Sequence, residues 1–325
     1  MSADAHWVLT TTEVATPLVA EVGGALVTNI ERIIRGTPDA VRLAVVTLLA
    51  GGHLLIEDLP GQGKTTLAKA LARSIGGQFR RVQGTADLLP SELTGVAVFE
   101  PSTGAWNFRP GPLFANVVLI DELNRSTPRT QSALLEAMAE SQITVDGKTY
   151  ALPDPFFVIA TQNPFDHAGT FPLVEGQRDR FATVLELGHP GPVAERDLLL
   201  GRGGSDHLDD LGAVVTMAQL VEAQRAVRAV QAVEKVVDYV VAIGAQTREH
   251  PNVRLGQSPR GSQALLHAAK AWAGLQGRYF VTPDDVQAMA PSVLAHRLVM
   301  RSGPGLEISR TTISEILANV AVPRG

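Results

Sequence analysis

The sequence predicts an α/β fold with a parallel sheet covered by helices on both faces, followed by a smaller, purely helical part. Between residues 54 and 187, short apolar segments alternate with helical segments, as in parallel sheets whose strands are buried on both faces. From residue 216 onward, helix-capping signals replace the strand pattern. A composition of 45% hydrophobic and 19% charged residues over 325 positions fits one large or two modest globular domains.

The expected elements follow one another in this order. One or two amphipathic helices lie between residues 13 and 49, where Thr37 and Pro38 form a helix start. Strands are expected at residues 54–57, 79–82, 117–120, 156–160 and 183–187, and helices at 64–75 and 130–140. We expect three parts: an α/β domain at 1–188, a hinge rich in Pro, Gly and Asp at 189–215, and an all-α domain at 216–325.

Two inserts interrupt the α/β part, and each is expected to form a β-hairpin. The first spans residues 96–108 around a turn at 101–104, and the second spans residues 143–152 around a turn at 146–147. Trp106, Phe108 and Phe114 are expected to pack the first hairpin onto the sheet, with contact to another protein as the alternative.

The segment from Leu54 to Lys69, LLIEDLPGQGKTTLAK, joins a strand, a glycine loop and a helix. Backbone N–H groups of such a loop and the positive end of the following helix attract phosphate oxygens. Lys64 is expected to reach the β and γ phosphates of a nucleotide, and the Thr65 hydroxyl to hold Mg²⁺. Asp58 replaces the first glycine of the GxxxxGK[ST] pattern, and Asp tolerates unusual backbone angles. The other loop residues expected to bind the nucleotide are Pro60, Gly61, Gln62, Gly63 and Thr66.

Asp121 and Glu122 directly follow the buried strand at 117–120. Ligands of doubly wound sheets bind at the carboxyl ends of the strands. We expect Asp121 to orient Mg²⁺ and its waters, and Glu122 to polarise the water that attacks the γ-phosphate. An acidic pair can also simply cap the next helix, but its place 57 residues after Lys64 favours the catalytic interpretation.

Asn163 ends the strand VIATQN, where its amide can place the same water. The alternative is an ordinary turn before Pro164.

Three arginines are candidates for contact with the γ-phosphate. Arg178 and Arg180 lie just before the last strand, where an arginine can reach the nucleotide of a neighbouring subunit. A surface ion pair is the alternative role. Arg260 begins a helix of the second domain, from which it can fold over the nucleotide.

Together these motifs resemble those of the AAA+ ATPases, and most closely the MoxR family, over nearly the whole chain from about Glu13. The motifs that carry the resemblance are GQGKTT (61–66), VVLIDELNRSTPRTQSALLEAM (117–138), VIATQNP (158–164), GQRDRF (176–181) and SPRGSQALLHAAKA (258–271). The resemblance implies an AAA+ P-loop αβα sandwich with a parallel sheet, a helix-two insert, a pre-sensor hairpin and a small all-α lid domain.

The resemblance also implies a role for each motif residue. Lys64 and Thr65 correspond to Walker A, Asp121 and Glu122 to Walker B, Asn163 to sensor 1, Arg180 to the arginine finger and Arg260 to sensor 2. Arg178 stands where family members commonly have a leucine, which leaves the finger open between Arg178 and Arg180.

The function that the resemblance implies is an ATP hydrolase with ATP and Mg²⁺ as cofactors. Such proteins form a ring of identical subunits, commonly a hexamer, and remodel or activate client proteins, often with a separate partner that carries a von Willebrand factor A (VWA) domain. Two alternatives stay open. One is a DNA-dependent motor like the helicases of the same clade, with Arg80, Arg81, Arg125 and Arg129 facing a pore. The other is a nucleotide-gated scaffold that scarcely hydrolyses ATP.

Composition and charge restrict the remaining classes. A net charge of −5 without a basic run argues against a large nucleic-acid footprint. The absence of cysteine excludes disulfides, thiol catalysis and thiolate metal sites, and the eight histidines form no metal-binding motif. No apolar run reaches the roughly 20 residues that span a bilayer, and the N-terminus lacks a signal-peptide pattern. We therefore expect a cytoplasmic protein without a membrane span.

Overall fold

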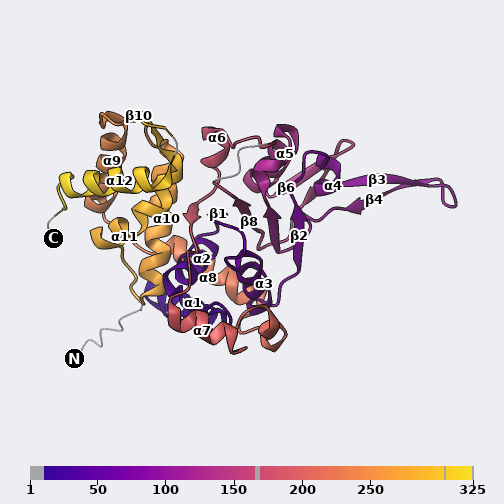
Figure 1. Cartoon of the computed structure of the whole chain (residues 1–325), viewed down its shortest axis with the longest axis horizontal. Coiled ribbons are helices and arrows are strands. Elements are labelled where there is room, and N and C mark those ends of the chain that lie inside the picture. The colour runs from indigo at the N-terminus through magenta and orange to yellow at the C-terminus, as the bar shows by residue number, and fades with distance from the viewer. Residues whose placement is uncertain (1–10, 165–168, 304, 324–325) are drawn as a thin grey trace, which may run out of the picture.

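The structure, a computed structural model, describes residues 11–164, 169–303 and 305–323 (Figure 1). Its centre is a sheet of five parallel strands in the order β2-β5-β8-β1-β9. The strands are β1 (Leu54–Glu57), β2 (Phe79–Gln83), β5 (Val117–Asp121), β8 (Phe157–Gln162) and β9 (Thr183–Leu185). Strands β1, β5 and β9 are buried along their whole length, because helices cover both faces of the sheet. The predicted parallel sheet is confirmed.

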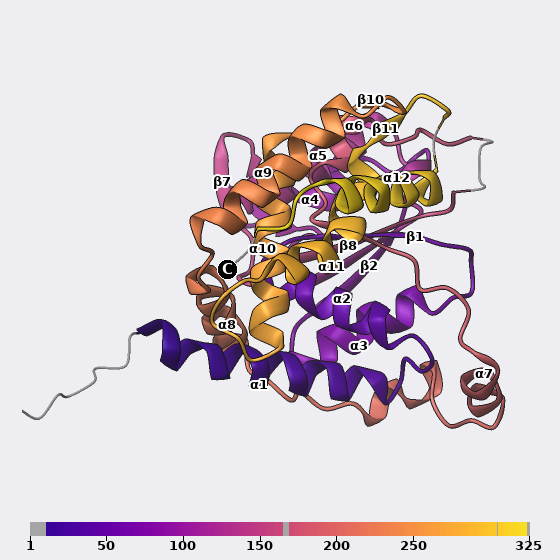
Figure 2. The same ribbon diagram turned by 90° about the vertical axis from the view of Figure 1, so that its left-hand side faces the viewer.

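Helices α2 (Pro38–Leu49) and α3 (Lys64–Ser74) lie on one side of the sheet, and α5 (Pro128–Glu140) lies on the other (Figure 2). Local sequence explains where they start: Pro38 and Pro128 occupy first-turn positions, and the Thr127 hydroxyl accepts a hydrogen bond from the Thr130 N–H. The remaining helical elements of this half are α1 (Thr11–Glu31), α4 (Pro90–Thr94), η1 (Leu123–Arg125) and α6 (Glu175–Arg178).

Both predicted hairpins are present in the structure. One pairs β3 (Gly95–Glu100) with β4 (Ala105–Pro110), and the other pairs β6 (Gln142–Val145) with β7 (Lys148–Ala151). Asp146 and Gly147 adopt φ angles of 50° and 77°, as a two-residue turn between antiparallel strands requires. The first hairpin projects from the body as an arm (Figure 1).

Aromatic contacts attach one part of this arm to the rest of the domain. The Phe108 ring packs edge-on against Phe114 and stacks on Tyr150 of the second hairpin, with ring centroids 5.4 Å and 4.1 Å apart. The expectation that Trp106 packs onto the sheet is wrong, since its side chain is 67% exposed and contacts Phe99 on the opposite strand. The cause is the strand register, which places this pair along the projecting part of the hairpin.

Helices dominate the second half of the chain. They are α7 (Pro192–Leu199), η2 (Ser205–Asp210), α8 (Met217–Ala229), α9 (Glu234–Glu249), α10 (Pro259–Leu275), α11 (Pro283–Leu294), η3 (Ala295–Arg297) and α12 (Leu306–Asn319). A short antiparallel pair, β10 (Val253–Leu255) and β11 (Val299–Met300), adds to the expected helices. Strands of three and two residues are too short to produce an alternating pattern that sequence reasoning can detect.

Helix α1 joins the two halves, because it packs against α2 and α3 below the sheet and also against α8 and α10 (Figure 2). The buried apolar side chains accordingly form one continuous core. Across the described ranges, every helix is too short or too polar to cross a bilayer.

Candidate active site

A cavity of about 360 Å³ lies at the carboxyl ends of the central strands, where the sheet topology brings four loops together. Its lining consists of Pro60, Gly61, Gly63, Lys64, Thr65, Thr66, Arg81, Gln83, Asp121, Glu122, Thr161 and Asn163. Nine of the thirteen residues that the sequence predicts to bind nucleotide or to act in catalysis therefore line one cavity. Gln62, Arg178, Arg180 and Arg260 do not line this cavity.

The loop between β1 and α3 places a fixed cation in the cavity. Gly61 and Gly63 have φ angles of 85° and 84°, a left-handed conformation that glycine adopts without strain. The Lys64 ammonium donates to the carbonyl oxygens of Asp58 and Leu59 at 2.6 Å and 2.9 Å. Partial burial lowers the pKa of Lys64, while the nearby carboxylates oppose this shift. The loop thus presents a lysine beside the N-terminus of a helix, as a phosphate site requires.

Asp58 has a different role from the one its position in the motif suggested. Its backbone does not adopt a positive φ, so a glycine is not needed here. Instead, Oδ1 accepts from the Leu59 N–H at 2.7 Å and Oδ2 accepts from the Gly188 N–H at 2.9 Å. Asp58 therefore connects the start of the loop to the segment that follows β9.

Asp121 and Glu122 point to different partners at the end of β5. Asp121 is 7% exposed; its Oδ1 accepts from the Thr161 hydroxyl at 3.0 Å and its Oδ2 lies 2.6 Å from Nη2 of Arg81. Glu122 has a φ of 54°, which is strained for a residue with a side chain. Its Oε2 accepts from Nε2 of Gln83 at 2.8 Å and also pairs with Arg125. The turn thus directs two adjacent carboxylates into separate hydrogen-bond networks.

The sequence did not assign four residues to this site, although Arg81 had been considered for a DNA pore. Arg81 and Gln83 alternate on β2, and they reach the carboxylates because β2 neighbours β5 in the sheet. Thr161 accepts from the Glu122 N–H at 2.9 Å and donates to Asp121. Gly84 allows β2 to approach, since a Cβ built on it would lie 2.3 Å from the Glu122 carbonyl oxygen. The i, i+2 spacing of Arg81 and Gln83 was the available signal, but its use required the strand order.

The donor set fits Mg²⁺. The Thr65 hydroxyl and the Asp121 carboxylate line the same cavity, and a magnesium ion at a nucleotide commonly takes only one or two protein oxygens, the rest coming from phosphates and water. The described part of the chain contains no cluster of three or more His, Asp or Glu side chains suited to a metal. The contact of Arg81 with Asp121 indicates that this carboxylate accepts a positive charge.

The candidate finger arginines have partners within their own chain. Nη2 of Arg178 lies 3.6 Å from Oε1 of Glu57, a buried carboxyl at the end of β1. Burial raises the pKa of Glu57, and the Arg178 charge opposes this rise. Nη1 of Arg180 donates to the Leu135 carbonyl of α5 at 3.3 Å. Arg178 thus compensates a buried charge, whereas the guanidinium of Arg180 donates to a neutral acceptor, the Leu135 carbonyl.

Arg260 and Gln62 are the two other predicted residues that do not line the cavity. Arg260 is exposed in the first turn of α10. The Gln62 amide lies 3.4 Å from Nδ1 of His189.

Comparison with known proteins gives this geometry a family. Residues 53–183 match the family model described as the ATPase family associated with various cellular activities (AAA), and residues 245–319 match the AAA lid domain. The uncharacterized protein YeaC of Bacillus subtilis is 46% identical over 92% of this chain and 94% of its own length. Chaperone MoxR1 of Mycobacterium tuberculosis is 36% identical over 91% of this chain and 81% of its own length.

A more distant relative and a solved structure agree with these matches. Protein MoxR of Methylorubrum extorquens is 31% identical over 88% of this chain and 89% of its own length. The crystal structure of a protein from Cytophaga hutchinsonii is similar with a TM-score of 0.87 at 30% identity, over 96% of this chain and 98% of that one. The chain therefore belongs to the MoxR family of AAA+ ATPases.

Proposed function

We propose that this protein hydrolyses ATP in a Mg²⁺-dependent reaction and uses the resulting conformational change to remodel client proteins. The observation that carries the proposal is the single cavity lined by Lys64, Thr65, Asp121, Glu122 and Asn163. A cation, two oxygen donors for a metal, a carboxylate base and an amide are the groups that γ-phosphate hydrolysis needs. Family membership supports the same reaction.

Each residue has a step in this reaction. Lys64 and the N–H groups of the loop bind the β and γ phosphates. Thr65 and Asp121 would hold Mg²⁺, which would neutralise phosphate charge. Glu122 accepts a proton from the attacking water, and Asn163 orients that water.

Nucleotide binding would change the internal partners of these groups. Lys64 would turn from the carbonyl oxygens of Asp58 and Leu59 toward phosphate oxygens, and Asp121 would be available to a metal once its contact with Arg81 is released. Glu122 leaves Gln83 in order to reach the water. Binding therefore rearranges the ends of β2 and β5, which carry these partners.

Two substitutions test the proposal. Lys64→Ala should abolish nucleotide binding, whereas Glu122→Gln should bind ATP but lower kcat by about 100-fold or more, since it removes the base. Phosphate release and titration with a fluorescent ATP analogue measure the two effects separately. Lys69→Ala is the matched control, because Lys69 is an exposed lysine of the same helix outside the cavity. Turnover that is unchanged in either cavity variant would contradict ATP hydrolysis at this site.

The DNA-motor alternative loses support from the geometry. Arg81 and Arg125, two of the four arginines considered for a pore, pair with Asp121 and Glu122. A DNA-stimulated turnover that falls steeply with salt would restore this alternative. Turnover at the uncatalysed rate would instead favour the scaffold.

We further propose three functional parts, a cytoplasmic location and a separate VWA-domain partner. Residues 1–188 form the nucleotide-binding domain, 189–215 the linker and 216–325 the lid; positions 1–10, 165–168, 304, 324 and 325 of these ranges lie outside the described residues. Support for the first boundary is that β9, the last strand of the central sheet, ends at Leu185. The partner is tested by affinity capture with the Glu122→Gln variant and ATP, which should retain a VWA-domain protein. Recovery of replication proteins would instead favour the DNA-motor alternative.

A further inference from the structure

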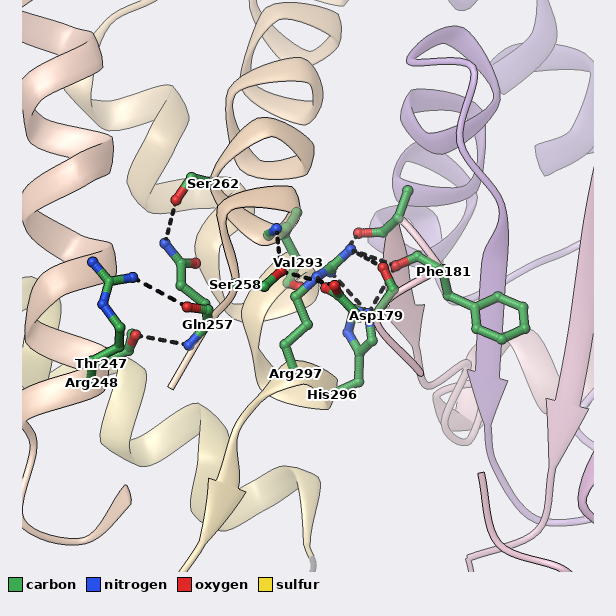
Figure 3. A network of polar contacts seen from close by, with 12 residues as sticks. Asp179, Phe181, Thr247, Arg248, Gln257, Ser258, Ser262, Val293, His296 and Arg297 are labelled. Carbon is green, nitrogen blue, oxygen red and sulfur yellow. Dashed lines mark hydrogen bonds and ion pairs between the residues drawn. The ribbon is translucent and has the colours of Figure 1, made fainter. Parts of the chain in front are cut away.

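The segment between α6 and β9 is held by two different elements of the second half of the chain (Figure 3). Asp179 is the link, because each of its carboxylate oxygens has its own donor. Oδ1 accepts from Nε of Arg297 in η3 at 2.9 Å, and Oδ2 accepts from the Ser258 hydroxyl at 2.8 Å. Arg180, the candidate finger, is the next residue after this doubly bound carboxylate.

Arg297 encloses the backbone around the candidate finger. Its side chain is only 2% exposed, and its Nη atoms donate to the carbonyl oxygens of Phe181 and Ala182 at 2.7 Å and 3.1 Å, and of Asp179 at 3.3 Å. The guanidinium thus contacts the chain on both sides of Arg180. Burial lowers the pKa of Arg297 to about 10, so the group stays charged at neutral pH. A planar, charged donor with several acceptors fixes its partners in one geometry.

Ser258 carries the same link into α10. It is the N-cap of this helix, since its hydroxyl oxygen accepts from the Gly261 N–H at 3.2 Å while donating to Asp179. Arg260, the candidate sensor 2, lies two residues further on in the first turn. One hydrogen bond therefore connects the residue before the candidate finger to the turn that carries the candidate sensor.

The N-terminus of α10 is also held by two residues of α9. The Gln257 N–H donates to the Thr247 hydroxyl at 3.0 Å, and Nη1 of Arg248 donates to the Gln257 carbonyl at 3.2 Å, so α9 holds the residue before Ser258 (Figure 3). The start of α10 is therefore fixed both to α9, through Gln257, and to Asp179, through Ser258.

We propose that Asp179 is a positioning residue that ties the arginine finger offered to the neighbouring subunit to the lid helix that senses the subunit's own nucleotide. This inference rests on the proposed function, in which Arg180 acts on the neighbouring site. Under this inference, the nucleotide bound to one subunit determines where that subunit's arginine finger lies in the nucleotide site of its neighbour. Arg297 and Ser258 are the two contacts through which Asp179 acts.

Rings assembled from two different variants distinguish this positioning role from a general contribution of Asp179 to the stability of its own subunit. Asp179→Asn keeps the shape of the side chain but weakens both contacts, and should lower kcat at least tenfold with nucleotide affinity unchanged within a factor of two. Mixed one to one with Glu122→Gln subunits, it should regain about a quarter of wild-type turnover, because half of the subunits keep the base and half of those receive an intact finger. The Arg180→Ala variant, mixed in the same way, calibrates the assay.

Each outcome is decisive. Recovery in both mixtures supports the inference. Recovery with Arg180→Ala but not with Asp179→Asn overturns it and leaves the proposed function intact, because the defect then lies in the variant's own site. Failure with Arg180→Ala overturns the neighbour-completed site and the inference together.

A second variant covers the case in which Asp179→Asn does not fold. Ser258→Ala removes one contact to Asp179, and should show the same loss of kcat and the same recovery in mixtures. Ser258→Thr keeps the hydroxyl and should behave like wild type. Ser262→Ala is the matched control, since the Ser262 hydroxyl lies one turn along α10 and accepts from Gln257 instead. Equal effects of Ser258→Ala and Ser262→Ala would contradict the role of Asp179.

Discussion

Gly84 allows the end of β2 to lie close to the turn that carries Asp121 and Glu122. A methyl group there would lie 2.3 Å from the Glu122 carbonyl oxygen, which is backbone and cannot turn away. We expect Gly84→Ala to lower the free energy of unfolding by about 1–3 kcal/mol, measured by urea denaturation. Gly24→Ala is the control: it has open space within α1 and should raise stability by about 0.5–1 kcal/mol, as Ala does in helix interiors. Equal effects of both changes would contradict the steric argument.

Arg178 compensates the buried carboxyl of Glu57. Because burial raises the pKa of Glu57 above 4.5, the folded protein holds this proton more tightly than the unfolded chain, and folding stability falls as pH rises through the raised pKa. Arg178→Met removes the opposing charge and should cost about 3 kcal/mol at pH 7. The double variant Glu57→Gln, Arg178→Met should recover most of this loss in urea denaturation. Additive losses would show that the two side chains act independently.

At the scale of elements, His53 joins α5 to β8. Its Nδ1 accepts from the Val158 N–H at 3.1 Å, and its Nε2 donates to the Met138 carbonyl at 3.2 Å, so the buried ring is neutral. Burial lowers the pKa of His53 to about 4, whereas the unfolded chain binds this proton near pH 6.5.

This difference predicts how stability depends on pH. The contribution of neutral His53 is fully present above pH 6.5 and is lost as pH falls toward 4. Between pH 7 and pH 5 it should decrease by about 2 kcal/mol. His53→Gln, whose amide can accept and donate at similar positions, should lose less over the same range in urea denaturation. An identical pH dependence of wild type and variant would exclude His53 as the cause.

At the scale of the whole molecule, one subunit does not bring an arginine finger to its own cavity. Arg178 pairs with Glu57, Arg180 donates to Leu135, and neither lines the cavity, so under the proposed function we expect the finger to come from a neighbouring subunit. Such contacts between unlike faces close into rings.

Turnover should therefore depend on assembly. ATP turnover per subunit is expected to rise with protein concentration, and Glu122→Gln with ATP should form a hexamer by light scattering. Arg180→Ala should lower kcat by about 10³-fold without preventing assembly. Full turnover in a monomeric preparation would contradict a site completed by a neighbour.

The sequence predicted features that depend on local geometry better than features that depend on how distant segments pack. A short continuous apolar run located β1 to the residue, and Asp146 with Gly147 located a hairpin turn, because both depend on local geometry. The projecting position of Trp106 was not predictable, because exposure depends on how far the hairpin extends beyond the body.

The sequence by itself determined the parallel sheet, the two hairpins and the phosphate loop. It also determined those cavity residues that belong to short sequence motifs, such as Lys64 with Thr65 and Asp121 with Glu122. These features depend on backbone preferences and on spacing along the chain. Only the tertiary structure decided the partners: Arg81 beside Asp121, Gln83 beside Glu122, and Arg297 around Asp179. Such pairs join segments that are brought together by the strand order β2-β5-β8-β1-β9 and by the packing of the second half against it. That arrangement is set by burial of the whole core, and no local stretch of sequence encodes it.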